Sequence, residues 1–219
     1  MSLTDVWPLF GLTLTTPRLT LRIVRDEDIP PLLEAALAGV HEPQVMPFDV
    51  PWTDAAPDKL RRNFAQHQWR QRVSVQPNDW TLNFAVILDG VPIGVQDLAA
   101  RDFSFRRTVS SGSWLTQSQQ GKGLGTEMRA AILLIAFDHL GAEVAESGAT
   151  SWNAASRGVS RRLGYSENGR GRRVTRPGEV TETVAMRLLK KDFVRPKWDV
   201  RVDGLDAALK DLIDVVEAG

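Results

Sequence analysis

The sequence predicts a mixed α/β fold with a mostly antiparallel central sheet and helices on both of its faces. Residues 12–24 and 80–98 alternate between apolar and polar side chains, as the strands of a half-buried sheet do. Residues 126–140 are apolar on most sides, as in a helix buried between two layers. A glycine-rich segment, residues 120–126, leads directly into that helix.

The composition is typical of an ordinary soluble chain, most simply a single domain. Its 219 residues are 42% hydrophobic and 25% charged, and the formal net charge is +0. No global basic field would therefore recruit nucleic acid or an anionic membrane. Cysteine is absent, which excludes disulfides, thiolate metal sites and a covalent thiol mechanism. The histidines lack a metal-ligand spacing, so no metal is expected.

We expect a cytoplasmic protein. The longest apolar run, residues 130–137, is far shorter than the roughly 18 residues of a membrane span. The N-terminus lacks the charged and then apolar pattern of a secretory signal peptide.

The N-terminal part predicts a strand at residues 12–24 and a helix ending near residue 38. After a loop, it predicts a second helix that starts near Asp54 or Pro57 and runs to about residue 73. Three prolines at residues 43–51 exclude a regular helix, so the loop is stiff. Its large side chains, and those nearby, either line a substrate pocket or cover the core. The candidate substrate residues are His41, Met46, Phe48, Trp52 and Trp80.

The middle of the chain predicts three antiparallel strands that lead into the glycine-rich segment. Strands at residues 80–88 and 91–98 are joined by Asp89-Gly90, a favoured hairpin turn. A third strand, residues 109–116, precedes the glycines, and Gly141 ends the buried helix.

Beyond that helix, the pattern predicts a strand at residues 143–150, which returns parallel by a crossover connection. A helix then starts near Asn153 and ends at Gly164. The last strand covers residues 180–188, and residues 169–178, rich in arginine and glycine, are expected to be a mobile hairpin tip.

The C-terminal extension, residues 191–219, is surplus to the domain of residues 1–190. Its residues 205–216 predict an amphipathic helix, whose apolar stripe must find a surface. The stripe packs either on its own subunit or on a second copy, and we interpret the extension as an element of homo-oligomer assembly. The stripe consists of Leu205, Leu209, Leu212, Ile213 and Val216.

The glycine-rich segment indicates an anion site, most simply for phosphate. Alternate glycines let the backbone approach a ligand closely, and the first turn of the next helix presents free N–H groups. A P-loop is excluded because Thr116 replaces its first glycine, and a dinucleotide fingerprint is excluded because Thr126 replaces its third. The remaining match is Gln120-x-x-Gly123-x-Gly125, the pattern with which GNAT acyltransferases bind the pyrophosphate of coenzyme A.

Four segments in order therefore resemble the GNAT superfamily, within it the branch of the ribosomal-protein N-terminal acetyltransferases RimJ and RimL. The resemblance covers about residues 12–190 and implies the GNAT fold, with residues 40–80 as a substrate-side insertion. The segments are Thr16-Pro17-Arg18-Leu19-Thr20-Leu21-Arg22, Asp89-Gly90-x-x-Ile93-Gly94, Gln120-x-x-Gly123-x-Gly125-Thr126-Glu127, and Asn153-x-x-Ser156 with Arg162-Leu163-Gly164-Tyr165.

This resemblance implies an acyl-CoA-dependent N-acyltransferase, in which an amine attacks the thioester directly. Pantetheine would pair with the edge of residues 113–116, and the N–H of Trp114 or Leu115 would polarise the thioester carbonyl. Ser156 would protonate the departing thiolate, and Asn153 would contact the pantetheine arm. The residues expected to bind the co-substrate are Ser113, Trp114, Leu115, Thr116, Gln120, Gly121, Lys122, Gly123, Leu124, Gly125, Thr126, Asn153 and Ser156.

Several assignments stay open at this point. The donor is acetyl-CoA by default, or succinyl-CoA, and the acceptor is the amine of a small molecule, a protein N-terminus or a lysine. A CoA-binding regulatory module without turnover is the alternative of a different class. Arg161 and Arg162 are candidates for the 3′-phosphate of CoA. The candidate general bases are His41, Asp97, Glu146 and Glu182.

Overall fold

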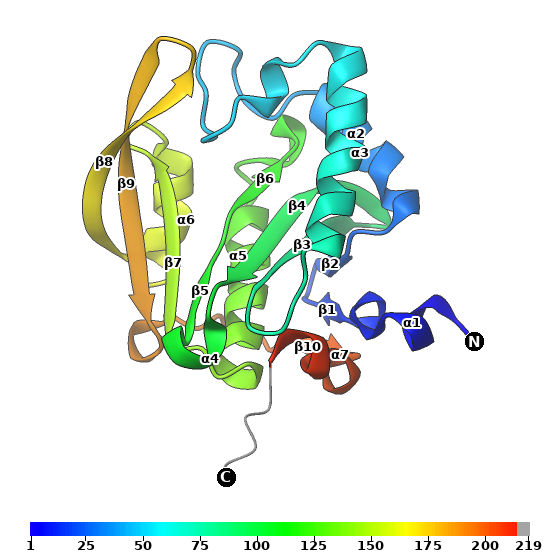
Figure 1. The fold of residues 1–219 in the computed structure, drawn as a ribbon. Helices are drawn as coiled ribbons and strands as arrows, with labels where there is room; N and C mark the ends of the chain where they lie inside the picture. Colours follow the sequence, from blue (N-terminus) through cyan, green and yellow to red (C-terminus); the bar gives the residue numbers. More distant parts are fainter. Residues whose placement is uncertain (214–219) are drawn as a thin grey trace.

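A computed structural model describes residues 1–213, which form one ten-stranded sheet with helices on both faces (Figure 1). The strand order is β10-β1-β2-β3-β4-β5-β7-β9-β8, and β6 pairs with β4. Within these residues only β5 and β7 pair in parallel. The predicted fold class is therefore confirmed.

The strands are β1 (Thr13–Thr15), β2 (Leu19–Ile23), β3 (Trp80–Leu88), β4 (Val91–Ala100), β5 (Thr108–Ser110), β6 (Ser113–Leu115), β7 (Val144–Thr150), β8 (Ser166–Arg176), β9 (Glu179–Leu189) and β10 (Arg201–Asp203). The α-helices are α1 (Leu3–Val6), α2 (Ile29–Leu37), α3 (Pro57–Val73), α4 (Phe103–Arg106), α5 (Leu124–Leu134), α6 (Ala154–Arg162) and α7 (Leu205–Leu212). None of the described helices is long and apolar enough to cross a membrane.

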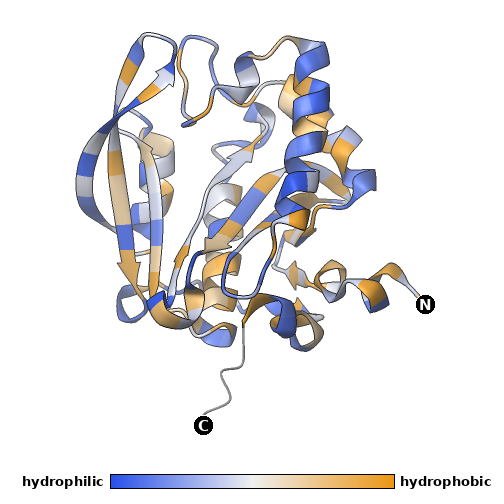
Figure 2. Cartoon of the chain, viewed as in Figure 1, coloured by the Kyte–Doolittle hydropathy of each residue, from blue (hydrophilic) through white to orange (hydrophobic). Residues whose placement is uncertain are grey.

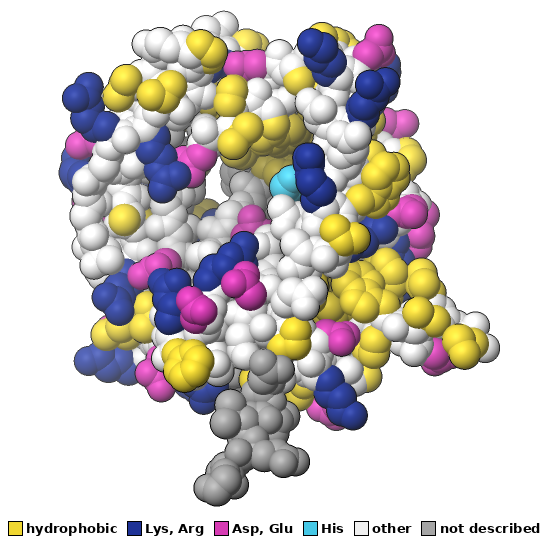
Figure 3. All heavy atoms as spheres, in the orientation of Figure 1, with side chains coloured by type: hydrophobic (Ala, Val, Ile, Leu, Met, Phe, Trp, Pro, Cys, Tyr) yellow, Lys and Arg dark blue, Asp and Glu magenta, His cyan; other side chains and the backbone are white. Residues whose placement is uncertain are grey.

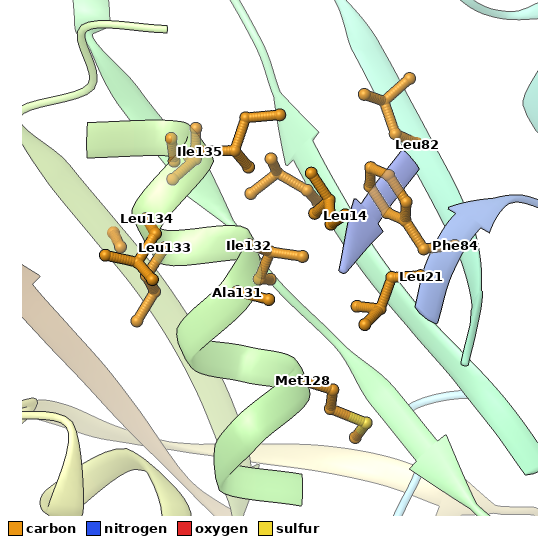
Figure 4. Packing of buried hydrophobic residues seen from close by; sticks show 14 of the residues in the cluster. Leu14, Leu21, Leu82, Phe84, Met128, Ala131, Ile132, Leu133, Leu134 and Ile135 are labelled. Atoms are coloured by element: carbon orange, nitrogen blue, oxygen red, sulfur yellow. The ribbon is translucent and has the colours of Figure 1, made fainter. Parts of the chain in front are cut away.

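The two faces of the sheet carry different helices. Helices α2 and α3 cover one face through a small cluster that includes Leu32, Phe64 and Val95. Helix α5 lies on the other face, where its side chains meet those of β2 and β3 in the main core (Figure 4). The outer side of α3 is hydrophilic, whereas β9 and α5 carry many hydrophobic positions (Figure 2). The alternation along β3 and β4 thus supplies both clusters.

Helix α5 is the buried helix that the sequence predicts. It is α-helical to Leu134 and continues as a π-helical turn, Ile135–His139, before Gly141 ends it with a positive φ of 76°. The hairpin turn is also confirmed, because Asp89 and Gly90 both have positive φ, 50° and 80°.

The first predicted strand is in fact two. Strands β1 and β2 run antiparallel with Leu14 opposite Leu21, and the chain turns between them at Pro17. Proline cannot donate a ladder hydrogen bond, so it interrupts the alternating pattern there. Thr16 closes the turn, because its backbone N–H donates to the Leu19 carbonyl at 2.9 Å.

The predicted strand at residues 109–116 is interrupted at Ser111-Gly112, which separates β5 from β6. The Asp97 carboxylate on β4 accepts the Gly112 N–H at 2.6 Å, in place of a backbone carbonyl. The Gln96 side chain donates to the Gly112 carbonyl at 2.8 Å. Beyond this point β6 stays paired with β4 but not with β7, whereas β5 pairs with both.

The hairpin predicted at residues 169–178 is present, but its turn is shorter than expected. Strand β8 runs to Arg176 and pairs with β9 through nearly its whole length, which leaves only Pro177-Gly178 as the turn. The backbone ladder stabilises this segment despite its polar sequence, because an antiparallel hairpin needs no apolar face on the solvent side.

The C-terminal extension packs on its own chain. Leu205, Ala208 and Leu212 of α7 are buried in the main core, and β10 pairs with β1. The carbonyl of Leu212 accepts the Trp80 indole N–H at 2.9 Å. The described part of the apolar stripe is therefore covered within the subunit, so the interpretation as an assembly element loses its basis. Predicted helix residues 214–216 lie outside the described residues.

Candidate active site

A cleft of about 1100 Å³ opens where β6 and β7 separate. Strand β6 pairs only with β4, and β7 pairs along its length with β9, so the two strand edges face each other across a gap. In the space-filling view the surface has a hollow between the two halves of the molecule, and other atoms close the hollow at the top (Figure 3). A substrate can therefore reach the middle of the sheet.

The edge of β6 offers free backbone groups to this cleft. Thr116 N–H donates to Ile93 O, and Asp97 N–H donates to Gly112 O, both at 2.9 Å. Antiparallel strands alternate their hydrogen-bonding direction, so Trp114 also faces β4. Ser113 and Leu115 consequently direct their N–H groups toward the cleft. Of the two predicted carbonyl-polarising groups, this geometry favours Leu115.

The glycine-rich loop forms one end of the cleft. Gly121 and Gly123 have positive φ, 73° and 81°, and Gly123 is the N-cap of α5. A Cβ atom at Gly121 would meet no protein atom within 4 Å. The first N–H groups of α5 have no acceptor within the helix and carry the positive end of its dipole. The loop therefore has the geometry of a phosphate site.

The loop's side chains have mostly structural roles. The Gln120 amide donates to the carbonyls of Val40 and Leu115 at 2.7 and 2.9 Å, so it fixes the loop. Lys122 donates to the Gln119 side chain at 3.0 Å, and Leu124 is buried in the core. The contacts expected between this loop and a phosphate therefore fall to its backbone N–H groups. Residues that line the cleft here are Gln120, Gly121, Gly123, Gly125 and Thr126.

A clamp from the turn between β1 and β2 holds the first turn of α5. The buried Glu127 carboxylate accepts the Thr16 hydroxyl at 2.7 Å, the Arg18 backbone N–H at 2.9 Å and the Arg18 Nε at 2.7 Å. Arg18 also donates to the Lys122 carbonyl at 3.0 Å. This clamp is not evident from the sequence, although Arg18 and Glu127 both belong to the family-like segments. They are 109 residues apart, so no local spacing joins them.

The start of α6 forms the wall opposite β6. Asn153 is its N-cap and accepts the Ser156 N–H at 3.0 Å. Asn153, Ser156 and Arg162 line the cleft, and no hydrogen bond of the Ser156 hydroxyl is formed within residues 1–213. Arg161 instead pairs with Glu167 at 2.9 Å. Arg162 is therefore the better placed of the two arginines for a phosphate.

The α2–α3 side of the cleft carries the acceptor candidates. His41 and Phe48 line it and contact each other with ring centroids 5.7 Å apart. His41 Nδ1 lies 2.8 Å from the Glu42 carbonyl and Nε2 lies 2.7 Å from the Thr53 hydroxyl. Because a carbonyl only accepts, Nδ1 is the protonated nitrogen and Nε2 is already engaged. His41 is thus a poor general base.

Three predicted substrate residues lie elsewhere. Trp80 is fully buried against Phe103, on the α5 face of β3, so it takes no part in the cleft. Met46 is buried beneath the loop. Trp52 packs against Trp114 with ring centroids 5.7 Å apart and supports the cleft from behind. Sequence alone cannot tell which face of an element a tryptophan occupies.

The structure separates the remaining base candidates. Glu182 pairs with Arg170 on the outer hairpin, away from the cleft. Glu146 and Asp97 both line the cleft. Burial raises the pKa of Asp97 to about 6, although the Gly112 hydrogen bond and the Arg129 charge oppose the shift. A carboxylate with this pKa is ionised at neutral pH and can still accept a proton.

The comparisons with known proteins agree with this geometry. A family model described as an acetyltransferase (GNAT) domain matches residues 18–166. Mycobacterium smegmatis RimJ, in complex with CoA-disulfide, is 20% identical with a TM-score of 0.71, covering 84% of this chain and 90% of that chain.

RimL, a ribosomal L7/L12 alpha-N-protein acetyltransferase in complex with coenzyme A, is 17% identical with a TM-score of 0.65, covering 80% and 95% of the two chains. A GCN5-related N-acetyltransferase from Brucella melitensis is 20% identical with a TM-score of 0.63, covering 82% and 79%. These similarities show a shared fold, and the family match spans more than half of the sequence. The chain therefore belongs to the GNAT acetyltransferase family and is an N-acyltransferase.

Proposed function

We propose that this protein transfers the acyl group of a CoA thioester to a primary amine that enters from the α2–α3 side. The observation that carries the proposal is the cleft itself. One end is a glycine loop at a helix N-terminus, and one wall is a strand edge with free N–H groups. The first suits a pyrophosphate, and the second suits the amides of pantetheine.

In the proposed reaction the neutral amine nitrogen attacks the thioester carbon. The carbonyl oxygen gains negative charge, which the Leu115 N–H stabilises. The carbon–sulfur bond then breaks as the amide forms, and the electron pair leaves with sulfur. Ser156 supplies a proton to the thiolate, and the proton lost by nitrogen passes to Asp97, directly or through water. The products are one amide and one free CoA.

Asp97 is our choice of general base, because it lines the cleft and its pKa lies near 6. A base is most effective when its pKa is close to the working pH. The lining carboxylates of Asp97, Glu146 and Glu42 also favour a cationic ammonium as the arriving acceptor, which releases one proton to solvent before the neutral amine attacks.

For the acceptor we propose a slender amine, either a polypeptide N-terminus or a small molecule. Residues 43–54 cross above the cleft and are tied to the β8–β9 hairpin, because Arg176 donates to Asp54 and to the Pro43 carbonyl. Arg173 pairs with Asp49 beside it. A folded protein surface that presents a lysine would collide with residues 43–54, which we call the roof of the cleft.

Calorimetry with CoA tests the binding part of the proposal through Gly123→Val. A β-branched side chain at this left-handed position strains the loop and fills the space where the phosphate would meet the backbone. We expect at least a tenfold loss of CoA affinity in a folded protein. Gly178→Val is the matched control, since Gly178 has a similar φ of 77° in the hairpin turn, outside the cleft. Equal affinities in the two variants would contradict the pyrophosphate site.

A further inference from the structure

Arg129 is a buried arginine at the floor of the cleft. It lies on α5, one turn and a half beyond the glycine loop, and its side chain reaches the gap between the separated strands. The guanidinium donates to Ser113 of β6 at 3.3 Å and to Ser147 of β7 at 3.1 Å. Its relative exposure is 3%, and it belongs to the cleft lining.

The charge of Arg129 is not neutralised by a direct partner within residues 1–213. Its bonded acceptors are the hydroxyls of Ser113, Ser147 and Ser160, and its Nε has no acceptor. Arg22, which is less deeply buried, forms a two-bond ion pair with Asp28. The Asp97 carboxylate is near enough to feel this charge but forms no hydrogen bond with the guanidinium, so Arg129 keeps N–H groups available for a further anion.

The site's chemistry favours a carboxylate. A guanidinium presents its N–H groups in a planar fork that matches a carboxylate or a phosphate. The phosphate positions belong to the glycine loop, which follows the C-terminal end of β6. Arg129 contacts Ser113 at the opposite end of that strand, roughly 10 Å from Thr116 by strand geometry. That is where a chain running from the loop along β6 would carry its acyl group.

We propose that Arg129 binds the terminal carboxylate of the acyl group, so that the donor is a dicarboxylic acyl-CoA of succinyl type. This inference rests on the proposed function and refines its donor. The carboxylate is a spectator in the transfer, because it only holds the acyl chain while the thioester reacts. Binding energy from such a remote group can position the reacting carbon.

The surroundings distinguish the donor from the acceptor as the source of the carboxylate. Arg129 reaches the cleft from the α5 face, where the glycine loop lies. On the α2–α3 side the lining groups include Asp97, Glu146 and Glu42, which repel an anionic acceptor. The acyl end is also polar, since Ser147 donates to the Ser111 carbonyl at 3.2 Å and Ser113 lies opposite. The methyl end of an acetyl group could not hydrogen-bond to these hydroxyls or to the guanidinium, so the buried polar groups would gain no partner.

Two unreactive CoA thioethers test the proposal on the unaltered protein. S-(3-carboxypropyl)-CoA carries the terminal carboxylate, and S-butyl-CoA has the same chain length without charge. We expect the carboxylated compound to bind about 10- to 100-fold more tightly by calorimetry, as for a hydrogen-bonded ion pair. Equal affinities of the two thioethers would overturn the proposal. Failure of both compounds and of CoA itself to bind would instead refute the proposed function.

Variants then connect the preference to Arg129. In Arg129→Gln we expect the affinity ratio of the two thioethers to fall by about tenfold or more, and Arg129→Lys should restore part of it. Arg72→Gln is the control, because Arg72 is a recessed arginine on α3 outside the cleft. An unchanged ratio in Arg129→Gln would overturn the assignment.

Turnover identifies the source of the carboxylate. The rates of succinyl-CoA and butyryl-CoA are compared with glycine and with glycinamide as the amine. The proposal predicts that the preference for succinyl-CoA holds with both amines and declines in Arg129→Gln. If the effect of Arg129→Gln depended on the carboxylate of glycine instead, the anion would come from the acceptor and the donor assignment would be wrong.

Discussion

Asp97 has a structural role and a proposed catalytic role, and the forces on its carboxyl group oppose each other. Its carboxylate accepts the Gly112 N–H at the point where β5 and β6 separate, and this bond favours the ionised form. Burial in the cleft favours the neutral form and has the larger effect, so the pKa rises to about 6. The residue at the point where the cleft opens is therefore also the one that we propose as the base.

We predict that Asp97→Asn lowers kcat by about 100-fold or more while CoA affinity stays unchanged. Asparagine keeps an oxygen for the Gly112 N–H, so the strand separation should persist. In the unaltered enzyme kcat/KM should rise with pH through about 6, where Asp97 loses its proton. Stopped assays from pH 5 to 8 check this. A full rate in the variant, or an unchanged low-pH limb, would assign the base elsewhere.

The same substitution has a predicted effect on stability. The folded pKa of Asp97 lies above its ordinary value of 3.8, so the folded state binds this proton more tightly. The resulting stabilisation is present below about pH 4 and is lost as pH rises through about 6. Asp97→Asn should therefore be more stable than the parent at pH 8, by on the order of 2 kcal/mol, and this gain should shrink toward pH 4. Urea titrations measure it.

At the scale of elements, the cleft is defined by segments distant in sequence. The β8–β9 hairpin and the loop before α3 meet across the top of the cleft (Figure 1). Arg176 makes two bonds to Asp54, at 2.6 and 3.0 Å, and its side chain is largely buried. Arg176 in turn holds the pKa of Asp54 below its usual range. This contact limits what can enter from the acceptor side.

We predict that Arg176→Ala raises the KM for the amine by about tenfold and leaves the CoA affinity unchanged. The reason is that the roof loses its bidentate contact while the glycine loop is untouched. Arg195→Ala is the control, since Arg195 makes a comparable two-bond pair with Asp138 outside the cleft. A rise in KM equal to that of the control would show that the roof does not shape the acceptor site.

At the scale of the whole molecule, the C-terminal extension completes the core. Leu205 and Leu212 are buried, and the chain passes so close at Gly204 that a Cβ there would lie 2.3 Å from the Gly11 carbonyl oxygen. Removing residues 204–219 should lower the free energy of unfolding by roughly 3–6 kcal/mol, because the apolar burial contributed by two leucines is lost. Denaturant titration with light scattering checks this. A truncated protein of equal stability but smaller assembly mass would restore the assembly interpretation.

The sequence predicts the parts of the fold that depend on neighbouring residues. The Asp89-Gly90 turn, the buried helix and the glycine loop all rest on local chemistry, and all are found. The interruption of the strand at Gly112 depends on a carboxylate 15 residues earlier, which no local pattern signals. The same holds for the Arg18–Glu127 clamp. The composition of β8 predicts a mobile segment. The hydrogen bonds that order it come from β9, and a local composition does not show them.

The most direct test of the account is the stoichiometry of turnover. The protein is incubated with an acyl-CoA and a panel of amines, and free thiol and acylated amine are measured in the same samples. Direct transfer predicts equal amounts of the two products, formed continuously, with the acylated amine heavier by one acyl group. Tight CoA binding without any acylated amine across the panel would contradict an acyltransferase and favour a regulatory CoA-binding module.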